Sequence, residues 1–82
     1  MGELEEAKPL MEEALQGSKE TLGARHPSTL GSIHNMAMLL EDMGEVQEAK
    51  ALFEEAVQGA TETLGKDHPH TKIFQRGLDG CA

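Results

Sequence analysis

A 42-residue internal repeat constrains the fold of this chain more than any other feature of its sequence. The segment GELEEAKPLMEEALQGSKETLG at residues 2–23 aligns with GEVQEAKALFEEAVQGATETLG at residues 44–65. When the comparison is extended to residues 2–30 and 44–72, 18 of the 29 positions are identical. Identity at a fixed offset is typical of repeat proteins, whose copies fold alike. The sequence therefore predicts that the two segments form the same structure.

Between Gly23 and Gly65, apolar residues recur in steps of three and four, the period of one face of an α-helix. Two such series are separated by Gly44, which can take a positive φ at little cost and therefore suits the residue that ends a helix. A turn this short places two helices side by side and antiparallel. The two series are Leu30, Ile33, Met36, Ala37, Leu40 and Met43, then Val46, Ala49, Leu52, Phe53, Ala56, Val57, Ala60 and Leu64.

The repeat extends this prediction to the rest of the chain. Residues 2–22 match the helix predicted at 46–64, and the segment that begins at Pro69 matches the start of the helix that begins at Pro27. The predicted helices cover residues 2–22, 27–43, 46–64 and 69–77. Gly77 and Gly80 lower the helix propensity of the last segment. We therefore expect residues 78–82 to form a loose tail.

The linkers before the second and fourth predicted helices share a His-Pro pair, His26–Pro27 and His68–Pro69. Proline at the first helical position loses no hydrogen bond, because the N–H groups of the first turn have no partner within the helix. Both His26 and Ser28 are candidates for the cap of the second helix.

Composition limits the core of this 82-residue chain to aliphatic and small side chains. Aromatic residues make up 2% of the sequence, and Trp and Tyr are absent. A domain of this length is only marginally stable. Because interaxial distance depends on the size of the side chains in contact, Ala49 and Ala56 are expected to face another helix at close range.

The formal net charge of −8 is carried by the two copies, −4 in residues 2–23 and −4 in residues 44–65. Residues 24–43 carry −1 and residues 66–82 carry +1. Nucleic-acid binding requires a basic surface, so nucleic acid is excluded as a partner. No stretch has the length of a transmembrane helix, and the N-terminal residues are too polar for a signal peptide. The single cysteine forms no internal disulfide. We expect a cytoplasmic protein that does not enter membranes.

The residues that could carry chemistry do not form a recognised site. The spacing of His68, His70 and Cys81 does not match a zinc signature. His34 and Cys81 lack the third group that holds a catalytic base in place. We therefore expect no metal, no cofactor and no enzymatic activity.

The segment SIHNMAMLLEDMG resembles the first helix of a tetratricopeptide repeat, and GEVQEAKALFEEAV resembles the second. The 42-residue period and the LG-x-x-HP-x-T linker are similar to the kinesin-light-chain type of repeat. The resemblance implies an all-α fold, with antiparallel helix hairpins of an α-solenoid, about three full helices and a short C-terminal one. It also implies one whole repeat flanked by two partial repeats.

The same resemblance implies a function as a protein-interaction module that binds a partner peptide or helix. In this family the first helices line a concave groove. Carried over by position, the lining residues here are Gly31, His34, Asn35, Met38, Glu41 and Asp42. Asn35 matches the family asparagine that contacts the backbone of a ligand. An amide suits this role because it both donates and accepts hydrogen bonds.

A structural role is the alternative function. Each unit of a solenoid buries its apolar face only against its neighbours, so the first helix lacks an upstream partner. Part of its apolar stripe is expected to be exposed and to drive formation of a homodimer or an end-to-end oligomer. The stripe consists of Leu4, Ala7, Met11 and Ala14.

Overall fold

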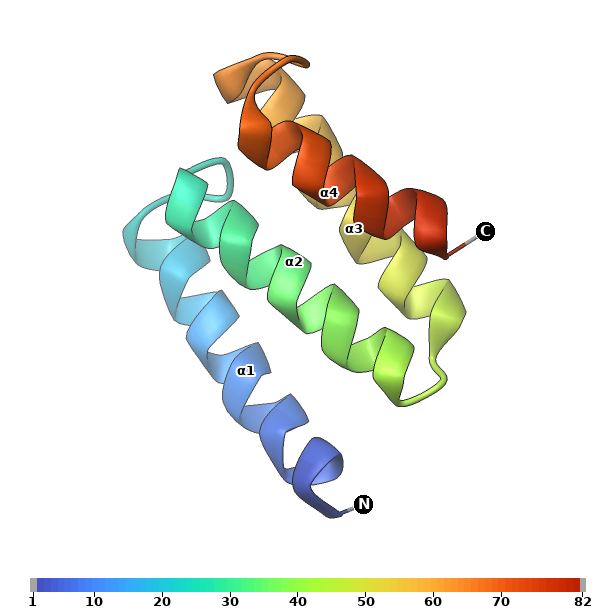
Figure 1. Cartoon of the computed structure of the whole chain (residues 1–82). Helices are drawn as coiled ribbons and strands as arrows, with labels where there is room; N and C mark the ends of the chain where they lie inside the picture. The colour runs from blue at the N-terminus through green and yellow to red at the C-terminus, as the bar shows by residue number, and fades with distance from the viewer. Residues whose placement is uncertain (1, 82) are drawn as a thin grey trace.

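The computed structural model describes residues 2–81, and within this range it places every side chain except that of Leu4. These residues form four α-helices and no strand, which confirms the all-α prediction (Figure 1). The helices are α1 (Gly2–Thr21), α2 (Pro27–Asp42), α3 (Val46–Leu64) and α4 (Pro69–Gly80). None of these helices is long and apolar enough to cross a membrane.

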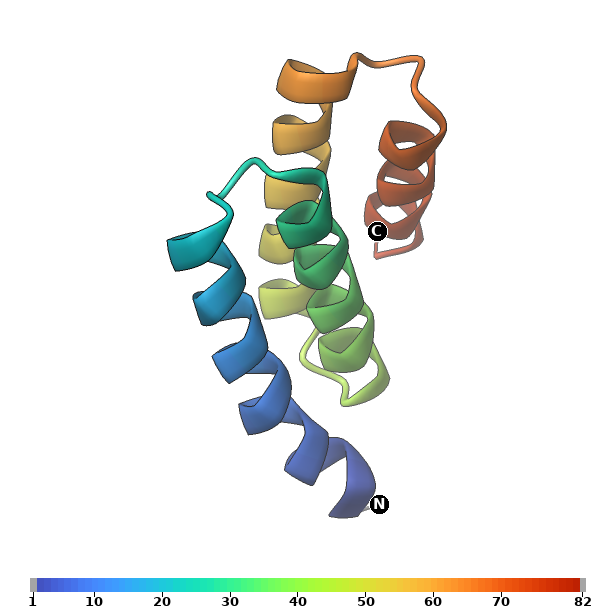
Figure 2. The same ribbon diagram turned by 90° about the vertical axis from the view of Figure 1, so that its left-hand side faces the viewer.

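Each helix packs against the next one along the chain, and α2 also contacts α4. The turned view in Figure 2 shows α1 and α4 on the two outer sides, with α2 and α3 between them. The resulting slab measures 37 × 31 × 17 Å. This arrangement leaves one long side of α1 and one long side of α4 without a helical neighbour among residues 2–81.

A glycine with positive φ lies just after each of the helices α1, α2 and α3. Gly23, Gly44 and Gly65 have φ of +99°, +85° and +93°, a region in which other residues are strained. The turn at Gly44 connects α2 with α3 as predicted. Since Gly23 and Gly65 occupy the same position in the repeat, the two linkers leave their helices in the same way.

Histidine caps the two helices that follow these linkers. His26 Nδ1 accepts a hydrogen bond from the backbone N–H of Ser28, and His68 Nδ1 accepts one from His70, both at 3.1 Å. Pro27 is the first residue of α2 and Pro69 the first of α4. His26, and not Ser28, is therefore the cap of α2.

The core lies where α2 meets α3, around the wholly buried ring of Phe53. Ala49 and Ala56 are also wholly buried, as their spacing predicted. Gly59 allows still closer packing, because a Cβ atom there would lie only 2.5 Å from Cδ2 of Leu30. The remaining buried apolar residues are Leu15, Leu30, Ile33, Met36, Ala37, Leu39, Leu40, Ala60, Phe74 and Cys81.

The C-terminal segment differs from its prediction. Helix α4 continues to Gly80, three residues beyond the expected end at residue 77, so residues 78–81 do not form a loose tail. Leu78 packs against the core, and the Cys81 thiol is only 7% exposed and donates to Glu41 Oε2 at 3.4 Å. These tertiary contacts offset the low helix propensity of glycine, which is a weak local preference. Ala82 lies outside the described residues.

Candidate functional site

Four of the six predicted groove residues share one side of α2. Gly31, Asn35, Met38 and Asp42 are spaced by four, three and four residues, so they lie along one face of the helix. Asn35 and Asp42 are exposed, Met38 is 47% exposed, and Gly31 is half-buried. We call these four residues the α2 strip. An amide, a thioether and a carboxylate are thus presented together along a rigid helix.

The other two predicted residues, His34 and Glu41, lie where α4 meets the rest of the molecule. The His34 ring is 5.4 Å from the ring of Phe53 and 4.9 Å from that of Phe74. Glu41 accepts the hydrogen bond from Cys81. Both side chains are therefore engaged by neighbouring helices and do not extend the α2 strip.

Burial determines the electrostatics of this junction. His34 Nδ1 is buried and has no hydrogen-bond partner among the described residues. Burial lowers the pKa of His34, because a charged imidazolium is poorly solvated between two aromatic rings. Burial also raises the pKa of the Cys81 thiol, and the hydrogen bond to Glu41 raises it further. A neutral imidazole and a neutral thiol are packing groups rather than reactive ones.

Helix α4 contributes an apolar side chain that sequence reasoning missed. Ile73, which is 47% exposed, stands at the position of α4 that corresponds to Gly31 of α2. The 42-residue offset is the signal that relates the two positions. Helix α4 therefore presents an exposed apolar side chain at the position where the α2 strip has Gly31.

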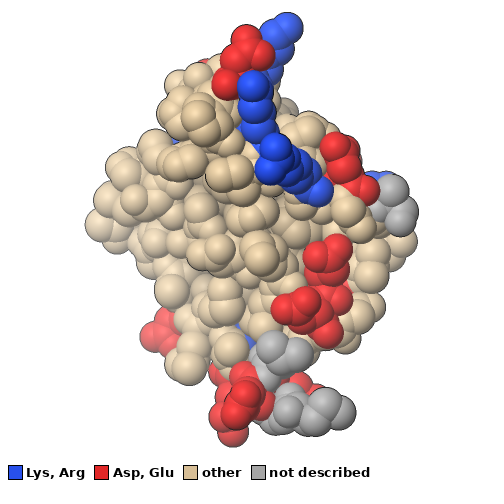
Figure 3. Space-filling view, viewed as in Figure 1, with Lys and Arg blue, Asp and Glu red and all other residues tan. Residues whose placement is uncertain are grey.

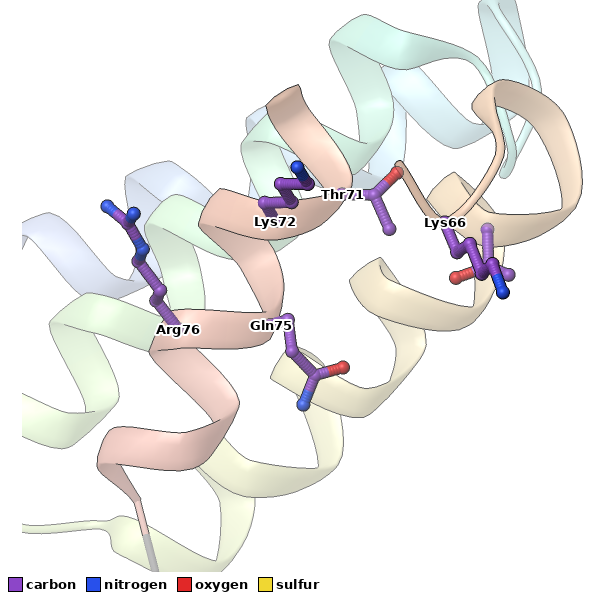
Figure 4. A pocket seen from close by; sticks show the side chains of 6 residues that line it. Lys66, Thr71, Lys72, Gln75 and Arg76 are labelled. Atoms are coloured by element: carbon purple, nitrogen blue, oxygen red, sulfur yellow. The ribbon is translucent and has the colours of Figure 1, made fainter. Parts of the chain in front are cut away.

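A second feature, a basic hollow of about 290 Å³, opens beside α4 and the end of α3. In Figure 4, Lys72, Gln75 and Arg76 project from α4, and Lys66 lies on the loop that precedes it. Lys66, Lys72 and Arg76 are exposed and form no ion pair within residues 2–81. The hollow is lined by Thr61, Lys66, Thr71, Lys72, Gln75 and Arg76.

The other cations on these helices are mostly paired. Lys8 pairs with Glu45, Lys19 with Glu55, and Arg25 with a carboxylate of α3. Figure 3 shows Lys and Arg gathered in the upper part of the face, over α4, with Asp or Glu beside them at the top and more Asp and Glu along the right-hand edge and at the lower end. The molecule is therefore acidic overall, with three exposed cations gathered beside the hollow.

On α1, the residues predicted for self-association differ in exposure. Ala14 is exposed, whereas Ala7 and Met11 are half-buried and pack against the core. The side chain of Leu4 lies outside the described residues. Leu10, which that prediction omitted, is 67% exposed, more than any other large apolar residue described. Its counterpart in the repeat, Leu52, is half-buried, so the 42-residue offset marks this position as one that a neighbour covers in the complete copy.

The histidine pair near α4 has structural roles. His68 caps the helix through Nδ1, and its ring packs against that of His70 at 5.1 Å. Across residues 2–81, no group of three or more His, Cys, Asp or Glu side chains is arranged to hold a metal ion.

Comparison with known families agrees with this architecture. The sequence model of the tetratricopeptide repeat matches residues 1–28 and 29–70, so the chain belongs to the tetratricopeptide repeat family. The second match contains α2 except for its first two residues, all of α3, the linker that follows and the first two residues of α4. A search among curated proteins finds no match. The kinesin-light-chain type of repeat, favoured by the 42-residue period, stays a prediction.

Proposed function

We propose that this protein is an interaction module that binds a partner peptide, extended or in a short helix, along the α2 strip. Membership of a family whose repeats generally mediate protein–protein interaction supports the broad role. The observation that carries the specific proposal is the exposure of Asn35, Met38 and Asp42 on one face of a helix held on both sides by its neighbours. We also infer a non-catalytic role and a cytoplasmic location, in keeping with a single cysteine that forms no internal disulfide.

The chemistry of the strip suggests what such a peptide carries. The Asn35 amide both donates to and accepts from a peptide backbone. Met38 offers a flexible, polarisable surface that adapts to different apolar side chains. Asp42 favours a cation at one end of the ligand. His34 is half-buried between Phe53 and Phe74, so its ring is engaged in packing and is not counted in the strip.

A peptide selection tests this proposal. Peptides are selected from a random library on the parent chain, and their affinities are then measured for the Asn35→Ala/Met38→Ala double variant by fluorescence anisotropy. We expect at least a tenfold loss of affinity, which corresponds to about 1.4 kcal/mol. Gln47→Ala is the control, because Gln47 is an exposed residue on α3. Selected peptides that bind the parent and the double variant equally would refute the assignment of the strip.

A second candidate function is self-assembly through α1. The large exposed fraction of Leu10, together with exposed Ala14 and Leu22, favours it, because these residues leave apolar surface in water. Sedimentation analysis over a range of concentrations checks this function. We expect the average mass to rise with concentration, and a compact monomer at high concentration would remove it.

A further inference from the structure

The repeat register gives each outer helix a counterpart inside the same molecule. Helices α1 and α3 are copies of one segment, and α2 and α4 begin as copies of another, with Pro27 matching Pro69 and Thr29 matching Thr71. The pair α2–α3 is complete. Within residues 2–81, α4 has no following helix of the α3 kind, and α1 has no preceding helix of the α2 kind. The complete pair therefore serves as a template for what each outer helix receives.

On α4, the surface that corresponds to the one covered by α3 is the basic hollow. Leu30 and Ile33 of α2 are buried, and Leu30 lies directly against Gly59 of α3. Their counterparts on α4 are Lys72 and Gln75, which are exposed and line the hollow. The shape of a helix-docking surface is thus retained, but its chemistry changes from aliphatic to basic.

On α1, the face that corresponds to the α2-facing side of α3 is not covered by another helix among the residues described. Gly17 is the counterpart of Gly59, yet at Gly17 no atom beyond its own turn of helix lies within 4 Å of an added Cβ, among the residues described. Ala14 is exposed, whereas its counterpart Ala56 is wholly buried. The close-approach surface of α3 is therefore duplicated on α1 and left uncovered.

The charges of these two surfaces are complementary. The segment that contains α1 carries a net charge of −4, and the hollow presents three cations that form no ion pair within residues 2–81. The ion pair that joins α1 to the residue before α3 also has a counterpart across the contact between copies. Lys8 Nζ lies 3.3 Å from Glu45 Oε2, and the counterparts of these residues are Lys50 and Glu3, which have no ion pair among the described residues.

We propose that copies of this chain stack head to tail, with α1 of one copy occupying, on α4 of the next, the place that α3 occupies on α2. This inference deepens the self-assembly function and is independent of peptide binding by the α2 strip. Gly17 of one copy meets the stem of Lys72 of the other, and the acidic α1 neutralises the basic hollow. The contact joins two different surfaces, so it propagates as an open chain of copies rather than closing as a symmetric dimer.

One pair of like charges weakens the contact. Arg25 and Glu62 form an ion pair at 2.5 Å. Their counterparts across the contact between copies are Asp67 of one copy and Glu20 of the next, two like charges that repel each other. Lys66 is adjacent to Asp67 and offsets part of that repulsion. Because the attraction is between exposed charges, salt screens it within a Debye length of about 10 Å at 0.1 M.

The test uses two variants that each remove one of the two surfaces. Gly17→Lys places a bulky cation on α1, and Lys72→Glu reverses the charge of the hollow. Both positions are exposed, so the fold is expected to persist, which circular dichroism checks. The controls Gln47→Lys and Gln47→Glu change charge in the same directions at an exposed residue of α3.

Sedimentation velocity at low and high salt then gives the result. We expect the parent and both controls to associate at low salt and to dissociate at high salt. Each single variant should associate at least tenfold more weakly. An equal mixture of the two variants should associate more strongly than either variant alone, because only the mixture contains an intact pair of surfaces.

Two other outcomes overturn the inference. If Gly17→Lys abolishes association and Lys72→Glu does not, the contact is a symmetric one between α1 helices, and the self-assembly function stands without this register. If the parent remains a monomer at every concentration, both the self-assembly function and the head-to-tail contact are wrong. Peptide binding by the α2 strip is unaffected in either case.

Discussion

Replacing Gly77 with alanine tests the close packing of α4 on α3. A Cβ atom at Gly77 would lie 2.5 Å from Phe53 Cε1, 2.8 Å from Phe53 Cδ1 and 3.1 Å from His34 Cε1. Since Phe53 is wholly buried, its ring cannot move aside without displacing the core. Overpacking of this kind costs about 1–3 kcal/mol. Two ring contacts below 3 Å place this substitution in the upper part of that range.

Helix propensity opposes this cost, because alanine is favoured over glycine inside a helix by about 0.8–1.0 kcal/mol. The expected net effect of Gly77→Ala is a loss of about 1–2 kcal/mol in the free energy of unfolding. For a domain of this size, that loss lowers the Tm by roughly 4–16 °C. The matched control is Gly31→Ala, because a Cβ atom at that position would have no neighbouring atom within 4 Å among the described residues. The control should gain about 0.5–1 kcal/mol.

Urea denaturation followed by circular dichroism measures both variants, at a protein concentration low enough to prevent association. The reasoning predicts opposite signs for the two substitutions, although both replace glycine with alanine inside a helix. If Gly77→Ala is as stabilising as Gly31→Ala, α4 does not pack on Phe53 at the distance described, and the account of its C-terminal half fails.

Three further predictions concern the core and its polar groups. Phe53→Ala should cost about 3–5 kcal/mol in the free energy of unfolding, and an unchanged melting curve would contradict the placement of this ring at the centre of the core. Thr71→Val removes the hydrogen bond from the Thr71 hydroxyl to the Gly65 carbonyl oxygen, 2.8 Å away, and should cost about 1 kcal/mol in urea denaturation. Burial lowers the pKa of His34 below its ordinary value of 6.5, so the unfolded chain binds the proton more readily. The free energy of unfolding should therefore fall as the pH drops through 6.5 and below, and His34→Gln should show a smaller fall in the same titration of urea midpoints.

Much of the fold follows from local signals in the sequence. The helix period, the glycines at positive φ and the His-Pro linkers each act within a few residues, so they can be recognised without knowing what packs against them. Only the structure distinguishes His26 from Ser28 as the cap of α2, because both side chains are close enough in sequence to reach an N–H of the first turn.

The candidate site could be predicted only in part. The family resemblance placed six expected groove positions on α2, but neither the resemblance nor the helix period reveals which of these positions a later helix covers. His34 and Glu41 are engaged because α4 packs with Phe74 and Cys81 against them. The basic hollow could not be predicted from the sequence for a related reason, since its residues come from α3, a loop and α4 and are brought together only by folding.

The sequence by itself determined that this chain is a stack of antiparallel helices from the tetratricopeptide repeat family, because a repeated pattern of small and large apolar residues admits few other packings. Only the tertiary structure decided how far α4 extends, since burial of Leu78 and Cys81 outweighs the weak preference of glycine against a helix. The tertiary structure also decided which faces remain free, because exposure depends on every helix packed nearby and not on the residues of one helix alone.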